Sequence, residues 1–168
     1  QARTALLASS LAEANRELAQ LALHDTLTRL PNRVLLEDRL EQAINKADRE
    51  GKLFALLFMD LDGFKAVNDA YGHDTGDKLL VAVTERLEQP LKGQYTLARI
   101  GGDEFVLLAE IDTPNDAASL ASSLVHAIDQ PFSLELYDLM VTLSVGIAIY
   151  PHDGKNQREL MFNADAAM

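Results

Sequence analysis

A glycine-rich turn between two apolar runs constrains this sequence more than any other stretch. Residues 95–100 and 105–109 have the length and the residue types of β-strands, and two consecutive glycines stand between them. Paired glycines between strands are typical of a hairpin turn, because glycine adopts positive φ without strain. The turn continues with two adjacent carboxylates, Asp103 and Glu104. Two acids at one turn repel each other unless a cation lies beside them, so the sequence indicates either a solvated acidic hairpin or part of a metal site.

Composition limits what such a metal site can be made of. The chain has 168 residues, 48% of them hydrophobic, which is enough for one domain with its own core. It contains no cysteine, so oxygen or imidazole would have to hold a metal, and oxygen-rich sites suit Mg²⁺, Mn²⁺ or Ca²⁺. The net charge of −11, with no basic run, argues against binding a nucleic-acid backbone but is compatible with a nucleotide screened by metal ions.

We recognise no pattern typical of a membrane span or of a signal peptide in this sequence. No apolar stretch approaches the ~20 residues needed to span a bilayer, and no basic-then-apolar signal peptide is present. We therefore expect no membrane contact by this chain. It starts at Gln1 and stops within a helical pattern at Met168, so we expect a fragment of a longer protein.

Residues 1–23 predict one helix, because they are rich in Ala, Leu, Glu and Gln and contain neither Gly nor Pro. Apolar and small residues recur at alternating three- and four-residue steps, at Thr4, Leu7, Leu11, Ala14, Leu18 and Leu21. This spacing is an a/d heptad seam over three heptads. Two interpretations stay open: a coiled-coil stalk that pairs two copies, or a helix that packs on its own domain.

The remaining pattern predicts an α+β fold. Helices are expected over 34–49, 64–70, 78–88, 112–129 and 156–168, strands over 53–59, 132–136 and 139–150, and loops over 24–33 and 71–77. Two adjacent strands joined by a hairpin favour antiparallel pairing over a doubly wound parallel sheet. We therefore expect an α/β sandwich in which helices flank a central, mostly antiparallel sheet.

A second acidic cluster follows the buried strand 53–59. Asp60 and Asp62 come where this strand emerges, and ligand sites favour strand ends. If this strand neighbours the hairpin, three or four carboxylates meet near a backbone carbonyl such as that of Leu61, and such a group suits a divalent metal that assists phosphoryl or nucleotidyl transfer. Lys65 follows near the start of a helix, and a helix N-terminus with a lysine suits a phosphate.

Five motifs, in this order, resemble the GGDEF family of diguanylate cyclases and together extend over residues 25–168. They read Asp25-x-Leu27-Thr28-x-Leu30-Pro31-Asn32-Arg33, Asp60-Leu61-Asp62-x-Phe64-Lys65-x-x-Asn68-Asp69-x-x-Gly72-His73-x-x-Gly76-Asp77, Arg99-x-Gly101-Gly102-Asp103-Glu104-Phe105, Ser144-x-Gly146-Ile147-Ala148 and Ala164-Asp165-x-Ala167-Met168. The resemblance implies a fold shared with class III nucleotide cyclases and polymerase palm domains. With the helix expected at 1–23, which is either an N-terminal helical stalk or packed on its own domain, this gives a GGDEF domain at 24–168 whose C-terminal helix is truncated.

The resemblance implies that two GTP molecules are condensed to cyclic di-GMP, with release of two pyrophosphates, by a homodimer in which each domain holds one GTP. Mg²⁺, or Mn²⁺ in its place, would be held by Asp60, the carbonyl of Leu61, Asp103 and Glu104. Asp103 also matches the position proposed as the general base. Lys65 would stabilise negative charge on the phosphates.

The resemblance also places guanine recognition on Asn68 and Asp77, with His73 and Phe64 in the same substrate-binding region. A carboxylate can accept hydrogen bonds from guanine N1–H and the 2-amino group, whereas adenine would leave a buried Asp77 unpaired. Without the resemblance, the pattern favours a helix C-cap for Asn68 and a loop-packing role for His73.

Three departures from the family pattern are visible. Many members carry an inhibitory Arg-x-x-Asp motif before the hairpin, where this chain has residues 92–95 reading Lys-Gly-Gln-Tyr, so the product-inhibition site is expected to be absent. Arg29 replaces a usual glycine, and Gly63 occupies a position that is often aromatic. We expect neither replacement to abolish activity.

Two other functions fit the same motifs. The chain could be a catalytically silent GTP-binding module that controls an adjacent cyclic di-GMP phosphodiesterase domain, or a dimerising signalling element whose output is the N-terminal helix. In each case the resemblance implies a cytoplasmic domain, within a bacterial signalling protein that can be anchored in the inner membrane.

Overall fold

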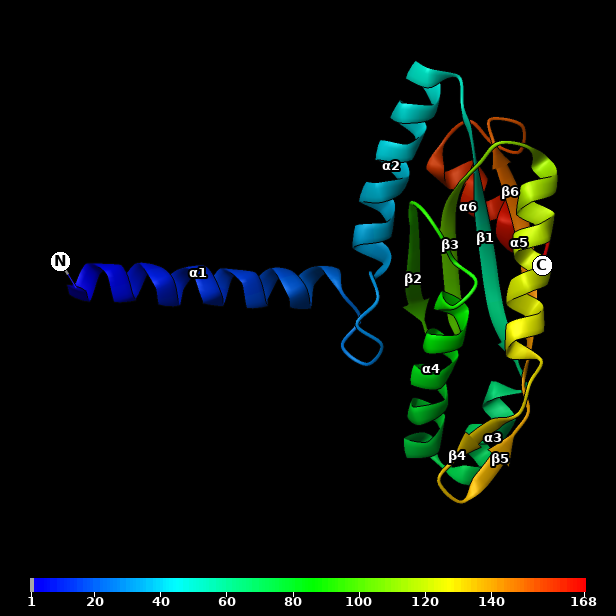
Figure 1. The fold of residues 1–168 in the computed structure, drawn as a ribbon, viewed down its shortest axis with the longest axis horizontal. Helices are drawn as coiled ribbons and strands as arrows, with labels where there is room; N and C mark the ends of the chain where they lie inside the picture. Colours follow the sequence, from blue (N-terminus) through cyan, green and yellow to red (C-terminus); the bar gives the residue numbers. More distant parts are fainter. Residues whose placement is uncertain (1) are drawn as a thin grey trace.

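The computed structural model describes residues 2–168 (Figure 1). In chain order its helices and strands are α1 (Ala2–Leu23), α2 (Arg33–Glu50), β1 (Leu53–Asp62), α3 (Phe64–Tyr71), α4 (His73–Glu88), β2 (Tyr95–Gly101), β3 (Glu104–Ile111), α5 (Pro114–Ile128), β4 (Phe132–Leu134), β5 (Tyr137–Leu139), β6 (Thr142–Tyr150) and α6 (Gln157–Ala166). The predicted mixture of helices and strands is therefore confirmed.

A four-stranded antiparallel sheet in the order β2-β3-β1-β6 forms the centre of the domain. The continuous apolar run of β1 explains its interior position, because a strand that is covered on both faces needs apolar residues at its odd and its even positions. A separate two-stranded hairpin is formed by β4 and β5. The predicted central antiparallel sheet flanked by helices is confirmed.

Alternate residues of β1 serve two cores, one on each face of the sheet. Leu57 and Met59 pack in a cluster with residues of α4 and α5, whereas Leu56 and Phe58 pack in a cluster with residues of α2 and α6. Helices consequently lie on both sides of the sheet in Figure 1. Strand β1 ends where β3 and β6 begin, and we call this end of the sheet the open end.

Helix α1 extends away from the domain, and none of its residues 2–23 is buried (Figure 1). Its leucines are strongly exposed; Leu7, for example, exposes 71% of its surface and Leu11 63%. The interpretation in which this helix packs on its own domain is therefore wrong. The coiled-coil interpretation stays a prediction.

Several predicted boundaries are wrong. Strand β1 continues through Asp60 to Asp62, because both residues pair with β6. The expected loop 71–77 is mostly helical, since α4 already begins at His73, directly after a break at Gly72. The expected strand 139–150 is divided between β5 and β6, because Leu139 pairs with β4 and not with the central sheet.

No helix among residues 2–168 is both long and apolar enough to cross a bilayer.

Candidate metal and nucleotide site

The two acidic clusters meet at the open end of the sheet. In the antiparallel register Asp60 of β1 stands opposite Glu104 of β3. Next to this pair, the backbone N–H of Leu61 donates a hydrogen bond to the carbonyl of Asp103 over 3.3 Å. Strands β1 and β3 are therefore neighbours, which is the condition under which the two clusters were expected to meet.

Asp60 lies in an environment that resists its ionisation. Partial burial raises the pKa of Asp60, and the nearby carboxylates of Asp103, Glu104 and Asp62 raise it further, to about 6. Its Oδ1 atom is buried and finds no hydrogen-bond partner within residues 2–168. A buried acceptor without a partner, surrounded by negative charge, suits a bound cation. The oxygen donors present here therefore fit a divalent metal ion.

Asp62 has a different role from the one expected. It accepts hydrogen bonds from the hydroxyls of Thr142, at 3.0 Å, and Ser144, at 2.9 and 2.7 Å, on β6. No three Asp, Glu or His side chains of the described chain are arranged to hold an ion by themselves. The carboxylates of Asp103, Glu104 and Asp62 nevertheless lie close enough to Asp60 to raise its pKa, and a metal here would need further oxygens from the backbone or from a substrate.

Thr142 and Ser144 are site residues that sequence reasoning missed. Ser144 belongs to a noted motif, but its partner depends on the register in which β6 pairs with β1. In that register Thr142 stands opposite Asp62 and Ser144 opposite Asp60. The one sequence signal for this contact is a pair of hydroxyl residues at alternate positions of a strand. This pattern alone does not show which neighbouring strand the hydroxyls face.

The turn between β2 and β3 depends on glycine. Gly102 has φ 46°, in the left-handed region that other residues adopt only with strain. The pairing of β2 with β3 also shifts register between Arg99 and Gly101. Beyond this irregularity Gly101 pairs with Glu104, the first residue of β3, which stands opposite Asp60 on the neighbouring strand.

The start of α3 offers a surface suited to an anion. Gly63 precedes the helix with φ 90°, and among the described residues no side chain caps the first turn. Lys65 is exposed at the second helical position. Free first-turn amides and a nearby ammonium group are favourable to a phosphate. Phe64, in contrast, is only 9% exposed and belongs to the core, so most of its ring is not available to a ligand.

Helices α3 and α4 bring together the residues predicted to bind guanine. The Oδ1 atom of Asn68 is buried and has no partner within residues 2–168. Asn68 is not the C-cap of α3, because Gly72 takes that position. A Cβ atom on Gly76 would lie 1.8 Å from the Asn68 Oδ1, so only glycine allows α4 this close to Asn68. His73 and Asp77 are exposed on the first turns of α4.

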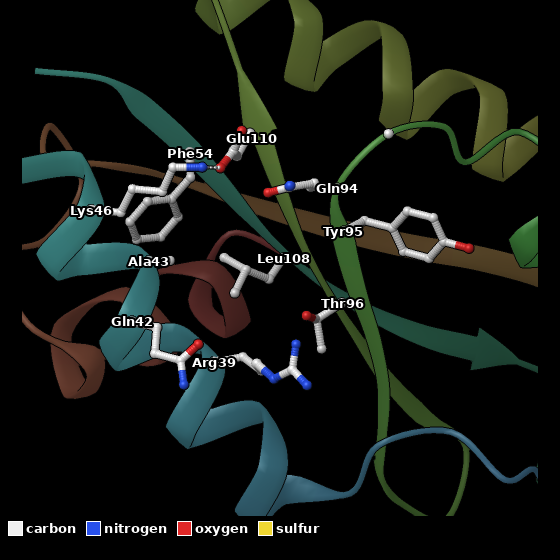
Figure 2. A pocket seen from close by; sticks show the side chains of 11 residues that line it. Arg39, Gln42, Ala43, Lys46, Phe54, Gln94, Tyr95, Thr96, Leu108 and Glu110 are labelled. Carbon is white, nitrogen blue, oxygen red and sulfur yellow. Dashed lines mark hydrogen bonds and ion pairs between the residues drawn. The ribbon is translucent and has the colours of Figure 1, made fainter. Parts of the chain in front are cut away.

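A groove of about 390 Å³ lies at the other end of the sheet, between α2 and the strands β2 and β3. Figure 2 shows Arg39, Gln42 and Lys46 of α2 across from Tyr95 and Thr96 of β2. Lys46 is paired with Glu110 at 2.6 Å. Three of the four residues that replace the Arg-x-x-Asp motif, residues 93–95, line this groove. At these positions the chain has neither the arginine nor the aspartate of that motif.

Comparison with known families gives one match over most of the chain. The family described as "Diguanylate cyclase, GGDEF domain" matches residues 22–168. The bifunctional diguanylate cyclase/cyclic di-GMP phosphodiesterase MucR of Pseudomonas aeruginosa is 61% identical over 168 residues, which are the whole chain and 24% of MucR. The cyclic di-GMP phosphodiesterase NbdA of the same organism is 38% identical over 166 residues, which are 99% of the chain and 21% of NbdA. The chain therefore spans about a quarter or less of these relatives.

A solved structure of a GGDEF family protein also matches this chain. The crystal structure of a sensory box/GGDEF family protein from Caulobacter crescentus matches with a TM-score of 0.83 and 39% identity. The match covers 86% of this chain and 94% of that one.

Proposed function

The chain belongs to the GGDEF family of diguanylate cyclase domains, and from this membership we propose that it condenses two GTP molecules to cyclic di-GMP and two pyrophosphates. The observation that carries the proposal is the meeting of Asp60 with Glu104, beside the Asp103 carbonyl, at the open end of the sheet. The buried, unpartnered Asp60 Oδ1 and the raised pKa of Asp60 support a cation at this place.

We assign the metal site to Asp60, the carbonyl of Leu61, Asp103 and Glu104. Mg²⁺, or Mn²⁺ in its place, would neutralise phosphate charge there and make the 3′-hydroxyl easier to deprotonate. Asp62 is not part of this set, and its oxygens accept hydrogen bonds from Thr142 and Ser144. Its role is to fix the end of β1 against β6, and thereby the position of Asp60.

The reaction is a displacement at phosphorus. The 3′-hydroxyl of one GTP attacks the α-phosphorus of the other, the bond from the α-phosphorus to the bridging oxygen breaks, and pyrophosphate leaves with the electron pair. Asp103 accepts the proton of the attacking hydroxyl. Lys65 and the uncapped first turn of α3 bind phosphate oxygens, where charge accumulates in the transition state. Repetition of the step with the nucleotides exchanged closes the ring.

Guanine selection is assigned to Asn68 and Asp77. The unpartnered Asn68 Oδ1 has an acceptor free for a guanine donor. The exposed Asp77 carboxylate can accept from N1–H and the 2-amino group together. His73, exposed at the start of α4, lies on the same helix and helps to position the nucleotide.

The product contains two nucleotides, so turnover requires a second copy of the chain. Each domain presents one acidic site, and the two attacks of the reaction are equivalent by symmetry. The exposed leucines of α1 recur with the heptad period that pairs two helices. We propose a homodimer joined along α1, with the two domains facing each other across bound GTP. The domain is proposed to act in the cytoplasm, where GTP is available.

A second function is favoured by one comparison. NbdA, a relative of 38% identity over nearly the whole chain, is named a cyclic di-GMP phosphodiesterase and not a cyclase. A GTP-binding domain without turnover, regulating an adjacent phosphodiesterase domain, would agree with that name. Measurement of GTP binding and of product on the same sample separates the two functions. Binding with cyclic di-GMP formation supports the cyclase, whereas binding without product supports the regulatory module.

A further inference from the structure

Arg99, just before the acidic turn, contacts two segments that are far apart in the sequence. Its backbone N–H donates to the carbonyl of Pro31 over 3.0 Å. Its Nη1 atom lies 3.0 and 3.1 Å from the carboxylate oxygens of Asp25. Its Nε–H donates to the carbonyl of Gly102 over 2.9 Å. One side chain therefore bonds both the loop that follows α1 and the turn that carries Asp103 and Glu104.

The loop at residues 24–32, which we call the stalk-base loop, is in turn fixed to the last turn of α1. The side-chain amide of Asn32 donates to the carbonyl of Ala22 over 2.9 Å. The backbone N–H of Asn32 donates to the carbonyl of Leu23 over 2.8 Å. Within the loop, the Asp25 N–H donates to the carbonyl of Leu30 over 2.7 Å. The loop is thus bonded to α1 at one side and to Arg99 at the other.

The ion pair at the centre of this arrangement is shielded from water. The Arg99 and Asp25 side chains are only 15% and 19% exposed. Asp25 also accepts hydrogen bonds from the backbone N–H and the hydroxyl of Thr28, at 2.8 and 2.7 Å, so its carboxylate is held in one orientation. A shielded, multiply bonded pair keeps a geometry that an exposed surface pair does not.

We propose that Arg99 is a positioning residue for the acidic turn, and that through Asp25 and Pro31 it ties the position of this turn to the base of α1. The part of the proposal that concerns turnover rests on the proposed function. The planar guanidinium is essential, because its separate N–H groups bond a carboxylate and a carbonyl at the same time. A lysine at this position can pair with Asp25 but cannot hold Gly102 with the same group and geometry.

The first experiment compares Arg99→Lys and Asp25→Asn with the wild type in the full chain with GTP and Mg²⁺. Misplacement of the turn should lower kcat by roughly 10- to 100-fold while KM for GTP changes by less than about threefold. Because Arg99 and Asp25 act as one unit, the double variant should lose little more than either single variant. A purely structural role predicts instead that kcat follows the loss of thermal stability.

Arg86→Gln is the matched control. Arg86 also bonds backbone carbonyls with its guanidinium, that of Ala127 in α5 and those of Gln130 and Pro131, but it links α4 to the end of α5 and the loop before β4. Its replacement should lower stability and leave kcat unchanged at temperatures below the unfolding transition. Equal losses of kcat in Arg86→Gln and Arg99→Lys variants of equal stability would overturn the proposal.

The second experiment needs no nucleotide and separates a failure of this inference from a failure of the proposed function. The Leu61 N–H bonds the Asp103 carbonyl, so its hydrogen exchange reports the position of the turn. Asp25→Asn should speed exchange at Leu61 by about tenfold or more and leave the core of α5 unchanged. Uniform acceleration, or none at Leu61, would overturn the inference even if the wild type makes cyclic di-GMP. A local change at Leu61 in a protein that makes no product would support the inference and contradict the cyclase function.

Discussion

Asp60 on β1 and Glu104 on β3 occupy directly opposed positions at the open end of the antiparallel sheet. Like charges opposite each other destabilise a pair of strands. This pair also lies beside Asp103, and the pKa of Asp60 is raised to about 6, first by burial and then by these neighbours. Such an arrangement is costly without a cation and favourable with one. This cluster of carboxylates is the physical reason for proposing a metal ion at this end of the sheet.

The raised pKa predicts how the metal-free protein responds to pH. Because the folded-state pKa of Asp60, about 6, exceeds its ordinary value of 3.8, the folded state binds this proton more tightly than the unfolded state. The stability that this proton contributes is complete below the ordinary pKa and is lost as pH rises through about 6. In EDTA, Asp60→Asn should therefore make the protein more stable than the wild type at about pH 7.5 and should reduce this pH dependence.

Urea unfolding of both proteins in EDTA and in Mg²⁺ checks this prediction. Mg²⁺ should stabilise the wild type more at about pH 7.5 than at about pH 5, because the metal competes with the proton, and it should affect Asp60→Asn little. A variant that is less stable than the wild type in EDTA at the higher pH would contradict the electrostatic account of this site.

Arg29 is expected to lower the free energy of unfolding. It adopts φ 68°, a left-handed conformation that is unfavourable for a residue with a Cβ atom. Arg29→Gly should raise the free energy of unfolding by about 0.5–1 kcal/mol, after allowance for the greater freedom of glycine in the unfolded chain. Arg29→Ala is the control, since it removes the side chain but keeps the strain. Equal stabilisation by both substitutions would show that the side chain, and not the backbone, is responsible.

Asp77 is expected to select the guanine base. Its carboxylate can accept from both N1–H and the 2-amino group, and inosine triphosphate lacks the amino group. The wild type should therefore use GTP better than inosine triphosphate by about tenfold in kcat/KM. Asp77→Asn should raise KM for GTP and remove most of this preference. Unchanged discrimination in the variant would remove Asp77 from the guanine site.

Product inhibition is expected to be weak. The groove at residues 93–95 lacks the arginine and aspartate that hold product in many members of the family. Cyclic di-GMP at a concentration equal to GTP should therefore slow the reaction by less than about twofold, because no bidentate arginine contact forms.

The groove also allows a gain-of-function control. The double substitution Lys92→Arg with Tyr95→Asp restores the motif and should introduce non-competitive inhibition by cyclic di-GMP. Strong non-competitive inhibition of the wild type would show that other groove residues, such as Arg39, replace the motif.

The sequence predicted that each acidic cluster lies at the end of a strand, whereas the finer arrangement of the site could not be predicted. Asp60 follows an apolar strand pattern and Glu104 lies at a hairpin, so local patterns were enough to place each at a strand end, but that the two strands are neighbours was only a condition of the prediction. The start of α4 at His73 was missed because Gly72 and Gly76 are both typical of loops. Gly76 instead lies inside the helix, where its missing side chain leaves room for Asn68. That is a tertiary contact, which local propensity does not encode.

The pairing of Asp62 with Ser144 was missed for a different reason. It depends on the exact register of β6 against β1, and these strands are separated by about eighty residues. A shift of one residue would turn Ser144 to the other face of the sheet. Likewise, the exposure of the leucines on α1 depends on where the helix points, and its amphipathic period is the same whether it packs on its own domain or on a second copy.

The most direct test of the central claim is to quantify both products of a reaction with GTP and Mg²⁺, for the wild type and for Asp60→Asn. The wild type should give cyclic di-GMP and pyrophosphate in a ratio of one to two. It should give no cyclic di-GMP in EDTA, and a folded, dimeric Asp60→Asn variant should give less by a factor on the order of one hundred or more, because it loses a metal ligand. GTP binding without cyclic di-GMP from the wild type, or equal product from Asp60→Asn, would contradict the proposed cyclase function.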